Sequence, residues 1–241
     1  MNMIKLRLLF LLILLIIYSG SFYPQSKDPK QILDNVKKAF EKIEDYEVDV
    51  HLKLDVPFLK MPESDAKLFF KQPDKIHVES EKFAVLPKEG LNFSPIGMLN
   101  GDHTALYERE DTLQNVKVSV VKLIPVGNDN DIILTTFWID QKRSLIIKVE
   151  SSRRPTGTFS LEFKYGIFDE HYVLPSSMVF TFTVEKMRFR RGMEDNIESD
   201  DDANKKDSGP VTGKVYLSYS NYKVNRGLPD ELFESDKKKA D

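Results

Sequence analysis

Histidines and carboxylates are the residues of this 241-residue chain whose chemistry could serve a metal site or a catalytic site. The four histidines stand at His51, His77, His103 and His171. None has another histidine at metal-ligand spacing, and the chain contains no cysteine. His51 and His77 fall on the charged phase of alternating, strand-like segments. We therefore expect them to face solvent and expect no metal site.

Other catalytic patterns are also absent from the sequence. There is no Gly-x-Ser-x-Gly elbow for a serine nucleophile, no glycine loop that would hold a phosphate and no dinucleotide fingerprint. Paired carboxylates such as Glu108 and Glu110 do occur, but they are expected by chance where 30% of the residues are charged. We therefore expect a protein that is not an enzyme and that needs no cofactor.

The N-terminus has the pattern of a secretory signal peptide. Lys5 and Arg7 precede the apolar run Leu8 to Tyr18, and the small residues Ser19 to Ser21 follow it. A run of about 11 residues is short for a membrane span, which needs about 20. We expect residues 1–21 to be removed, although an uncleaved anchor is the alternative. Because no cysteine could carry a lipid, we expect a soluble protein of the periplasm or, less readily, a secreted one.

The charge of the chain argues against nucleic acid as a ligand, and two further features could serve binding or structure. Loss of Lys5 and Arg7 with the signal peptide changes the formal charge from -3 to -5, and an acidic chain without a basic stripe is not expected to bind nucleic acid. The basic segment Lys186 to Arg191 could contact anionic headgroups or an acidic partner, or could simply end a strand. Trp138, the single tryptophan, could line a pocket or fill the core.

A helix followed directly by a strand organises the elements. Asp28 as N-cap and Pro29 at the first helical position predict a helix that reaches Glu44. Its apolar stripe consists of Ile32, Val36, Ala39, Phe40 and Ile43. Residues 46–56 then alternate between apolar and charged side chains, which is typical of a half-buried strand. Helix and strand must therefore share one apolar interior.

The remainder of the mature chain is mostly β-structure. After 46–56, alternation and turn residues predict strands at 65–72, 75–80, 83–86, 104–109, 116–124, 132–140, 145–151, 158–165, 178–186 and 214–224. Ser94 and Pro95 predict one or two turns of a second helix up to Met98. Residues 189–213 are acidic and almost without apolar side chains, so we expect a mobile loop there.

A sheet of this width cannot stay flat under so little helix. About ten strands at roughly 4.8 Å spacing span about 48 Å, whereas one helix is about 10 Å across. The sheet must therefore curl into a closed barrel or an open half-barrel with an apolar cavity under the helices. A membrane-spanning barrel is disfavoured because it would need no amphipathic helix and because several strands are short. We expect the cavity to be lined by Val48, Val50, Leu52, Leu54, Leu68, Phe70, Ile76, Val78 and Trp138.

Several segments resemble the LolA-type periplasmic lipoprotein carriers, also called outer-membrane lipoprotein-sorting proteins. The likeness lies in the helix 32–43 and the strand after it, in Phe70 to Ile76, in Thr104 to Tyr107, in Phe137 to Val149 and in the closing Asn225 to Pro229. It spans nearly all of residues 22–241, which we expect to form one domain. Each motif is weak alone, and their order and spacing carry the resemblance.

The resemblance implies a fold and a function. The fold is mainly β with helices (α+β), an open half-barrel of about ten antiparallel strands covered by the N-terminal helix and a short second helix. The cavity receives acyl chains of lipoproteins, or another lipid, from an inner-membrane lipoprotein-release transporter and passes them to an outer-membrane acceptor. We expect a monomer in which the helix is a movable lid, with Ile32, Val36, Phe40, Ile43 and Gln72 as its functional residues.

One position departs from the family. Well-known members have an arginine before the proline of the strand-turn motif, thought to hold the lid, and this chain has Gln72. Glutamine offers hydrogen bonds without charge, so a charge-based latch is in doubt. Two other functions remain open. A regulator of the RseB type would use the same half-barrel to sense envelope stress, and a lipid hydrolase would need a catalytic group that the sequence lacks.

Overall fold

The computed structural model describes residues 27–56, 61–80, 99, 101–127, 132–154, 157–184 and 211–234. Within them, ten strands form one sheet, accompanied by one α-helix and one short 3₁₀-helix. The elements are α2 (Pro29–Phe40), β1 (Asp45–Asp55), β2 (Ser64–Lys71), β3 (Lys75–Glu79), β4 (His103–Leu113), β5 (Val116–Pro125), β6 (Ile132–Asp140), β7 (Leu145–Arg153), β8 (Gly157–Phe168), β9 (Tyr172–Val184), β10 (Val211–Val224) and the 3₁₀-helix η3 (Asp230–Phe233).

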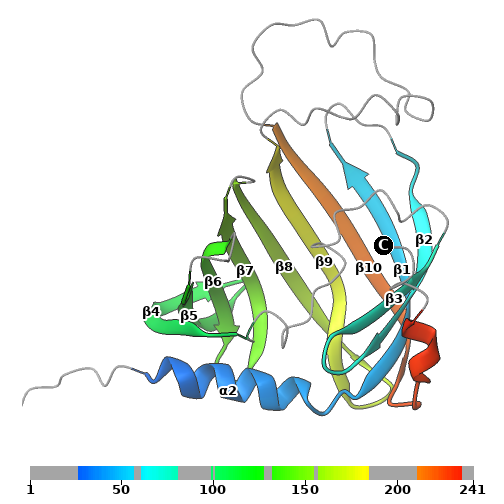
Figure 1. Cartoon of the computed structure of the whole chain (residues 1–241), viewed down its shortest axis with the longest axis horizontal. Coiled ribbons are helices and arrows are strands. Elements are labelled where there is room, and N and C mark those ends of the chain that lie inside the picture. The colour runs from blue at the N-terminus through cyan, green and yellow to red at the C-terminus, as the bar shows by residue number, and fades with distance from the viewer. Residues whose placement is uncertain are drawn as a thin grey trace, which may run out of the picture.

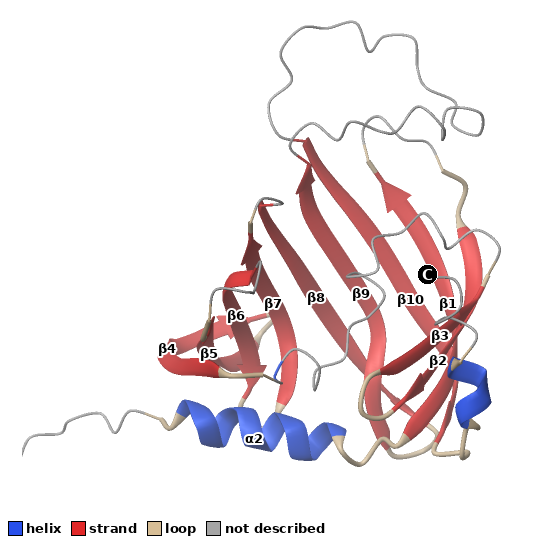
Figure 2. Cartoon of the chain, in the orientation of Figure 1, coloured by secondary structure: helices blue, strands red, loops and turns tan. Residues whose placement is uncertain are grey.

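The sheet is antiparallel throughout and is not closed. Its strand order is β3-β2-β1-β10-β9-β8-β7-β6-β5-β4, so the first and last strands of the chain pair in its interior. β3 and β4, which follow one another in sequence, form the two opposite edges. Figure 1 shows the sheet curling around a concave side, with α2 lying across one end. The predicted open half-barrel is confirmed, and Figure 2 shows how far strands outweigh helix.

Alternation along β1 sets which side is the interior. Val48, Val50 and Leu52 are at most 2% exposed and belong to the main hydrophobic core, whereas the intervening His51 is exposed. Successive side chains of a strand point to opposite faces, so this phase fixes the concave side of β1. Core residues of all the other strands except β3 and β4 join the same cluster, which makes the concave side apolar.

Several predicted boundaries were wrong. α2 ends at Phe40 and not at Glu44, because the chain turns at residues 41–42 to enter β1. β9 begins at Tyr172, six residues before the predicted start, and Pro175 lies in it beside a register shift against β8. Proline is tolerated in a sheet at such a bulge.

The predicted acidic loop was too long at its C-terminal end. β10 already begins at Val211, and Gly213 pairs with Phe182 of β9. A Cβ atom at Gly213 would lie 2.6 Å from the ring of Phe182, so only glycine allows this close approach. A glycine can therefore belong to a strand when a large ring covers it.

Some expectations fall outside the described residues. They are the signal peptide at 1–21, the strand at 83–86, the short second helix at 94–98, residues 189–210 of the acidic loop and the basic segment Lys186 to Arg191. Leu99, just after the expected second helix, is helical and 1% exposed. No helix in the described part of the chain is long and apolar enough to cross a bilayer.

Candidate functional site: an apolar pocket beneath helix α2

α2 is built to lie with one face against the sheet. The Asp28 carboxylate accepts a hydrogen bond from the backbone N–H of Lys30 at 2.9 Å, and Pro29 occupies the first helical position. An N-cap of this kind satisfies one of the free N–H groups at a helix start. Leu33 and Val36 are buried. Lys37 and Lys38 lie in the last turn, where their positive charges interact favourably with the negative end of the helix dipole. The helix is therefore amphipathic, with its apolar stripe toward the sheet.

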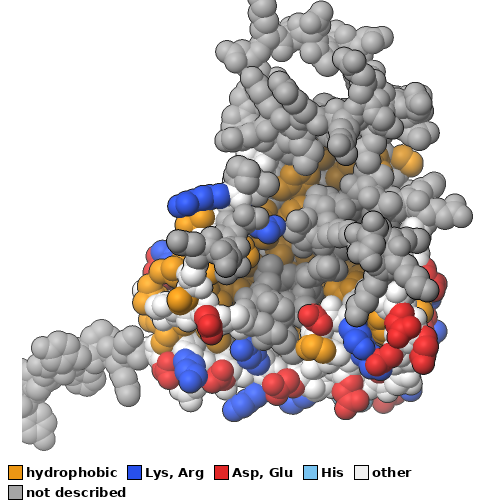
Figure 3. Space-filling view, in the orientation of Figure 1, with side chains coloured by type: hydrophobic (Ala, Val, Ile, Leu, Met, Phe, Trp, Pro, Cys, Tyr) orange, Lys and Arg blue, Asp and Glu red, His pale blue; other side chains and the backbone are white. Residues whose placement is uncertain are grey.

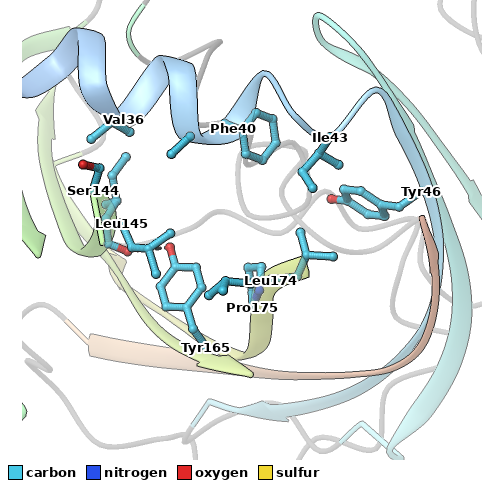
Figure 4. A pocket seen from close by; sticks show the side chains of 12 residues that line it. Val36, Phe40, Ile43, Tyr46, Ser144, Leu145, Tyr165, Leu174 and Pro175 are labelled. Carbon is cyan, nitrogen blue, oxygen red and sulfur yellow. Dashed lines mark hydrogen bonds between the residues drawn. The ribbon is translucent and has the colours of Figure 1, made fainter. Parts of the chain in front are cut away.

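An apolar pocket separates the C-terminal half of α2 from the ends of three strands. Figure 4 shows side chains of the helix on one side and of β7, β8 and β9 on the other, pointing toward one another. The lining residues are Val36, Ala39, Phe40, Ile43, Tyr46, Ser144, Leu145, Ile146, Tyr165, Val173, Leu174 and Pro175. The pocket has a volume of about 60 Å³. An apolar cavity of about 150 Å³ accepts benzene, so this pocket is too small for an acyl chain unless α2 moves.

The walls of this pocket are neutral. Burial raises the pKa of Tyr46 and of Tyr165 far above the usual value for tyrosine, so both phenols stay protonated. The hydroxyl of Tyr165 donates a hydrogen bond to the Ile146 carbonyl at 2.7 Å. The polar end of this lining residue is thus satisfied by the sheet itself, which leaves an apolar surface for a ligand.

The predicted lid residues lie around this pocket. Val36, Phe40 and Ile43 line it, and Ile32 lines a second hollow next to it. The opposite wall of the pocket was not predicted from the sequence; it consists of residues 144–146, Tyr165 and residues 173–175. Tyr165 continues the inward phase of Leu161 and Phe163 on β8, which was the available signal. The strand 172–177 was not predicted, so its residues could not be placed.

The predicted cavity residues of β1, β2 and β3 occupy the concave face. Among them Val48, Val50, Leu52, Leu68 and Phe70 are buried, and Leu54, Ile76 and Val78 pack partly buried against the core. None of these eight lines the pocket beneath α2. Phe70 joins the two regions, because its ring contacts Phe40 edge-on at 5.5 Å between centroids and stacks on Tyr46 at 5.0 Å.

Trp138 requires a correction. Its neighbours Phe137 and Ile139 in β6 belong to the core on the concave side, so Trp138 points to the opposite face of the sheet. There it pairs across the strands with Lys148, whose ammonium nitrogen lies 4.8 Å above the indole ring. The expectation that Trp138 lines the cavity was wrong because it ignored the phase of this residue in its strand.

Gln72 holds the C-terminal end of α2. Its side-chain amide donates hydrogen bonds to the carbonyls of Phe40 at 3.2 Å and Ile43 at 2.7 Å. The backbone N–H of Gln72 also donates to the carbonyl of Glu44 at 2.8 Å. The last carbonyls of a helix lack partners within it, and Gln72 donates to one of them, Phe40, and to the Ile43 carbonyl in the turn that follows α2. A neutral side chain thus binds the backbone where α2 ends and the following turn begins.

The closing segment of the chain anchors the same end. Asn225 accepts a hydrogen bond from the backbone N–H of Glu44 at 2.8 Å and donates to the carbonyl of Lys42 at 3.0 Å and to the hydroxyl of Tyr172 at 3.1 Å. Its side chain thereby connects the turn after α2 to β9. This arrangement gives the closing motif a structural role that its sequence did not disclose.

Asp45 completes this anchor. Its buried carboxylate accepts hydrogen bonds from the backbone N–H groups of Arg226, Gly227 and Leu228 at 2.8, 2.9 and 3.1 Å. Gly227 has a positive φ of 75°, which lets three consecutive N–H groups converge on one side chain. The contacts of Gln72, Asn225 and Asp45 are called the C-terminal clamp below.

The N-terminal end of α2 is held differently. The ammonium group of Lys27 contacts the carboxylate of Glu110 on β4 and donates to the side-chain oxygen of Gln141, both at 2.6 Å. The side chains of Lys27 and Glu110 are 39% and 60% exposed. Exposed ion pairs contribute little to stability and weaken in salt. We call this contact the N-terminal latch.

His51, on the charged phase of β1, lies on the solvent side of the sheet. His51 contacts Asp65 at 2.8 Å and Glu63 at 3.1 Å, and these hydrogen bonds hold the pKa of His51 above its usual value. The expectation that His51 faces solvent is confirmed. No group of three or more metal-ligating side chains occurs in the described segments. Figure 3 shows charges of both signs along the edge that carries α2 and hydrophobic side chains over the sheet above it.

Comparison with known proteins gives the class of fold. No family model and no curated protein matches the sequence. Solved structures do match: one described as an outer membrane lipoprotein-sorting protein domain from Vibrio parahaemolyticus is 12% identical, with a TM-score of 0.55 over 87% of this chain and 99% of that one. A DUF1329 family protein from Desulfovibrio piger is 13% identical, with a TM-score of 0.58 over 88% and 99% of the two chains.

A third solved structure has the same fold. A LolA superfamily protein from Nitrosomonas europaea is 12% identical, with a TM-score of 0.51 over 87% of this chain and 98% of that one. These similarities cover most of the chain and lie at the level of fold. The protein therefore has a LolA-type fold, as the sequence motifs predicted.

Proposed function

We propose that this protein is an extracytoplasmic carrier that binds the acyl chains of lipoproteins, or of another lipid, beneath α2 without catalysing a reaction. The observation that carries the proposal is the apolar pocket between α2 and β7 to β9, closed by a helix with unequal anchors at its two ends. Each methylene of a buried chain contributes about 0.8 kcal/mol, so partial burial already gives useful affinity.

The concave face provides the rest of the proposed binding surface. When α2 moves outward, the pocket opens toward Phe70 and from there toward the apolar phase of β1 to β3. The residues we assign to this surface are Val48, Val50, Leu52, Leu54, Leu68, Phe70, Ile76 and Val78. The proposed lid consists of Ile32, Val36, Phe40 and Ile43, with Gln72 holding its end.

The sequence and the proteins with the same fold support a cellular setting for the proposed carrier. We assign residues 1–21 to a cleaved signal peptide and 22–241 to one carrier domain in the periplasm. A lipoprotein-sorting protein is among the structures of this fold, which supports lipoproteins as cargo. An inner-membrane lipoprotein-release transporter would then be the donor and an outer-membrane protein the acceptor, with a monomeric carrier between them.

Native mass spectrometry of the protein from a periplasmic fraction tests this function. We expect a co-purified lipid or lipoprotein in the wild type and a reduced amount in Ala39→Phe, which fills the pocket with a ring. Lys38→Phe places the same ring on the exposed neighbour and serves as the matched control. A protein that carries neither lipid nor lipoprotein in any variant, and that takes up no acyl probe, is not a carrier. Capture of a membrane-bound regulator without lipid transfer would instead indicate a sensor.

A further inference from the structure

A polar hollow adjoins the apolar pocket along α2. Ile32 and Asn35 of the N-terminal half of the helix face it, and Ser119, Ile139 and Gln141 lie on the sheet side. Its volume is about 190 Å³. Ser144 lines both this hollow and the apolar pocket, and Figure 4 shows it beside Val36 at one end of the apolar pocket. The two spaces therefore follow one another along a single helix.

Ser119 is the feature that the fold itself does not explain. It lies on the concave side of β5, paired with Ile139 of β6, and is 1% exposed. Its hydroxyl has no hydrogen-bond partner among the residues that the structure describes. Burying a hydroxyl without a hydrogen-bond partner costs free energy. The next two inward positions of β5 hold the apolar side chains of Val121 and Leu123. A polar residue at this position points to a ligand.

The surrounding groups decide what kind of ligand fits. Asp140 lines the hollow, but its carboxylate already accepts hydrogen bonds from the side chain of Arg143 at 2.6 Å and from the backbone N–H groups of Lys142 and Arg143. Burial opposes its ionisation, yet these bonds outweigh that effect and hold its pKa below the usual value. Lys27 is likewise neutralised by Glu110. The charges at the hollow are thus paired within the protein.

What remains for a ligand is a set of uncharged hydrogen-bonding groups. Ser119 and Ser144 offer hydroxyls, Asn35 offers a side-chain amide, and Gln141, whose oxygen accepts from Lys27, offers its amide N–H groups. Such groups bind ester or amide carbonyls and hydroxyls. A phosphate would meet the carboxylate of Asp140, while Lys27, the one cation among the described residues of the hollow, is already paired with Glu110. Neutral recognition therefore fits the site better than anion binding.

We propose that this hollow binds the neutral glycerol-ester part of an acylated ligand whose chain lies in the adjoining apolar pocket. The inference rests on the proposed carrier function and adds a ligand class to it. An acyl chain attached to an ester would run from the pocket beneath Phe40 past Ser144, so that its carbonyl reaches Ser119. The hollow would then fix the direction in which a ligand enters.

Three fluorescent probes with the same pyrene-labelled alkyl chain test the proposal. The first ends in a glycerol ester, the second in a methyl group and the third in a phosphate. We expect the wild type to prefer the glycerol ester. Ser119→Ala should weaken the binding of the glycerol-ester probe by about five-fold, which corresponds to the loss of one hydrogen bond. It should leave the affinity for the methyl-ended probe unchanged. Ser177→Ala on β9, which lines neither space, should change none of them.

Stability and selectivity make the outcomes distinct. Because the Ser119 hydroxyl has no partner among the described residues, Ser119→Ala should keep or raise the thermal midpoint, and a clear drop would show a structural hydroxyl and overturn the proposal. Equal binding of the glycerol ester by wild type and Ser119→Ala would also overturn it, while the carrier function would stand if the methyl-ended probe binds. Preference for the phosphate probe would contradict a neutral site. Failure of all three probes would end both proposals.

Discussion

The two ends of α2 are held by different chemistry. At the C-terminal end, Gln72, Asn225 and Asp45 make short hydrogen bonds to backbone groups, and the Asp45 carboxylate is buried. At the N-terminal end, Lys27 makes one exposed ion pair and one hydrogen bond through a long side chain. Hydrogen bonds to a buried charged group are worth about 1.5–3 kcal/mol each, whereas an exposed ion pair is worth about 0.2–1 kcal/mol.

This difference gives the proposed lid a direction of movement. A helix clamped at one end and weakly latched at the other opens by swinging from the latched end. Pocket residues near the clamp, such as Ile43, would move least, and residues near Val36 would move more. Opening would widen the pocket toward Ser144, where the polar hollow begins. If the protein is the carrier we propose, this asymmetry links the anchors of the helix to the entry of the ligand.

Removing the buried carboxylate of the clamp should have the largest effect. Asp45→Ala leaves the N–H groups of Arg226, Gly227 and Leu228 without their acceptor, and we expect a loss of about 3 kcal/mol in the free energy of unfolding. Urea titration measures it. Asp55→Ala, at the exposed end of the same strand, should cost less than about 0.5 kcal/mol. Similar losses for both would mean that no clamp exists.

Truncating Phe40 separates a lid from a fixed core helix. A phenylalanine in a rigid core costs about 3–5 kcal/mol on truncation, which we expect for Phe137→Ala in β6, where the side chain is fully buried. Phe40 borders an existing pocket and is only partly buried, so Phe40→Ala should cost about 2 kcal/mol and should change the rate of acyl-probe uptake. A core-sized loss with unchanged uptake would identify a fixed helix.

Changing Gln72 tests the C-terminal clamp with a smaller expected loss of stability. Gln72→Ala removes two hydrogen bonds to the end of α2, and we expect a loss of about 1 kcal/mol with faster probe release. Gln72→Arg keeps hydrogen-bond donors and adds a charge next to the negative end of the helix dipole, so it should slow release. Stopped-flow release of a fluorescent acyl probe measures both. Identical rates in the three proteins would remove Gln72 from the mechanism.

Weakening the latch should change stability least. Lys27→Ala is expected to cost less than about 0.5 kcal/mol yet to speed uptake, and 1 M salt should reproduce this in the wild type. The hydrogen bond from Lys27 lowers the pKa of Glu110 from its usual 4.5. The stabilisation is therefore present above that pH and is lost as the pH falls through the lowered pKa. Lys30→Ala is the control. If the rate of probe uptake is the same after Lys27→Ala, in 1 M salt and at low pH, the N-terminal latch has no role in uptake.

The sequence was most informative where one face of an element is buried. Alternation along residues 46–56 predicted β1 and its inward side chains, and the apolar stripe predicted for the helix contains four of the residues that line the pocket. In both elements one side is buried, and the repeat of apolar residues along the sequence, with the period of a strand or a helix, shows which side that is. Pro175, by contrast, concealed the start of β9 because proline usually marks a strand boundary.

The anchors and the polar hollow could not be predicted in the same way. The clamp joins Gln72, Asp45 and residues 225–228, which are far apart in the chain and meet only because β1 pairs with β10 in the interior of the sheet. Nothing in the local pattern around Ser119 distinguishes a buried serine from an exposed one. Strand order and register decide both, and these depend on pairings between distant segments.

Crosslinks at the two ends of α2 test most directly whether the helix swings from its N-terminal end. Because the chain contains no cysteine, only the introduced cysteines can react. A short thiol-reactive linker between Lys27→Cys and Glu110→Cys locks the latch, and the same linker between Lys42→Cys and Arg226→Cys locks the turn beside the clamp. We predict that the first crosslink slows acyl-probe uptake more than ten-fold and that the second changes it less than two-fold. Equal rates after both crosslinks, or a larger effect at the clamp, would contradict a lid that swings from its N-terminal end.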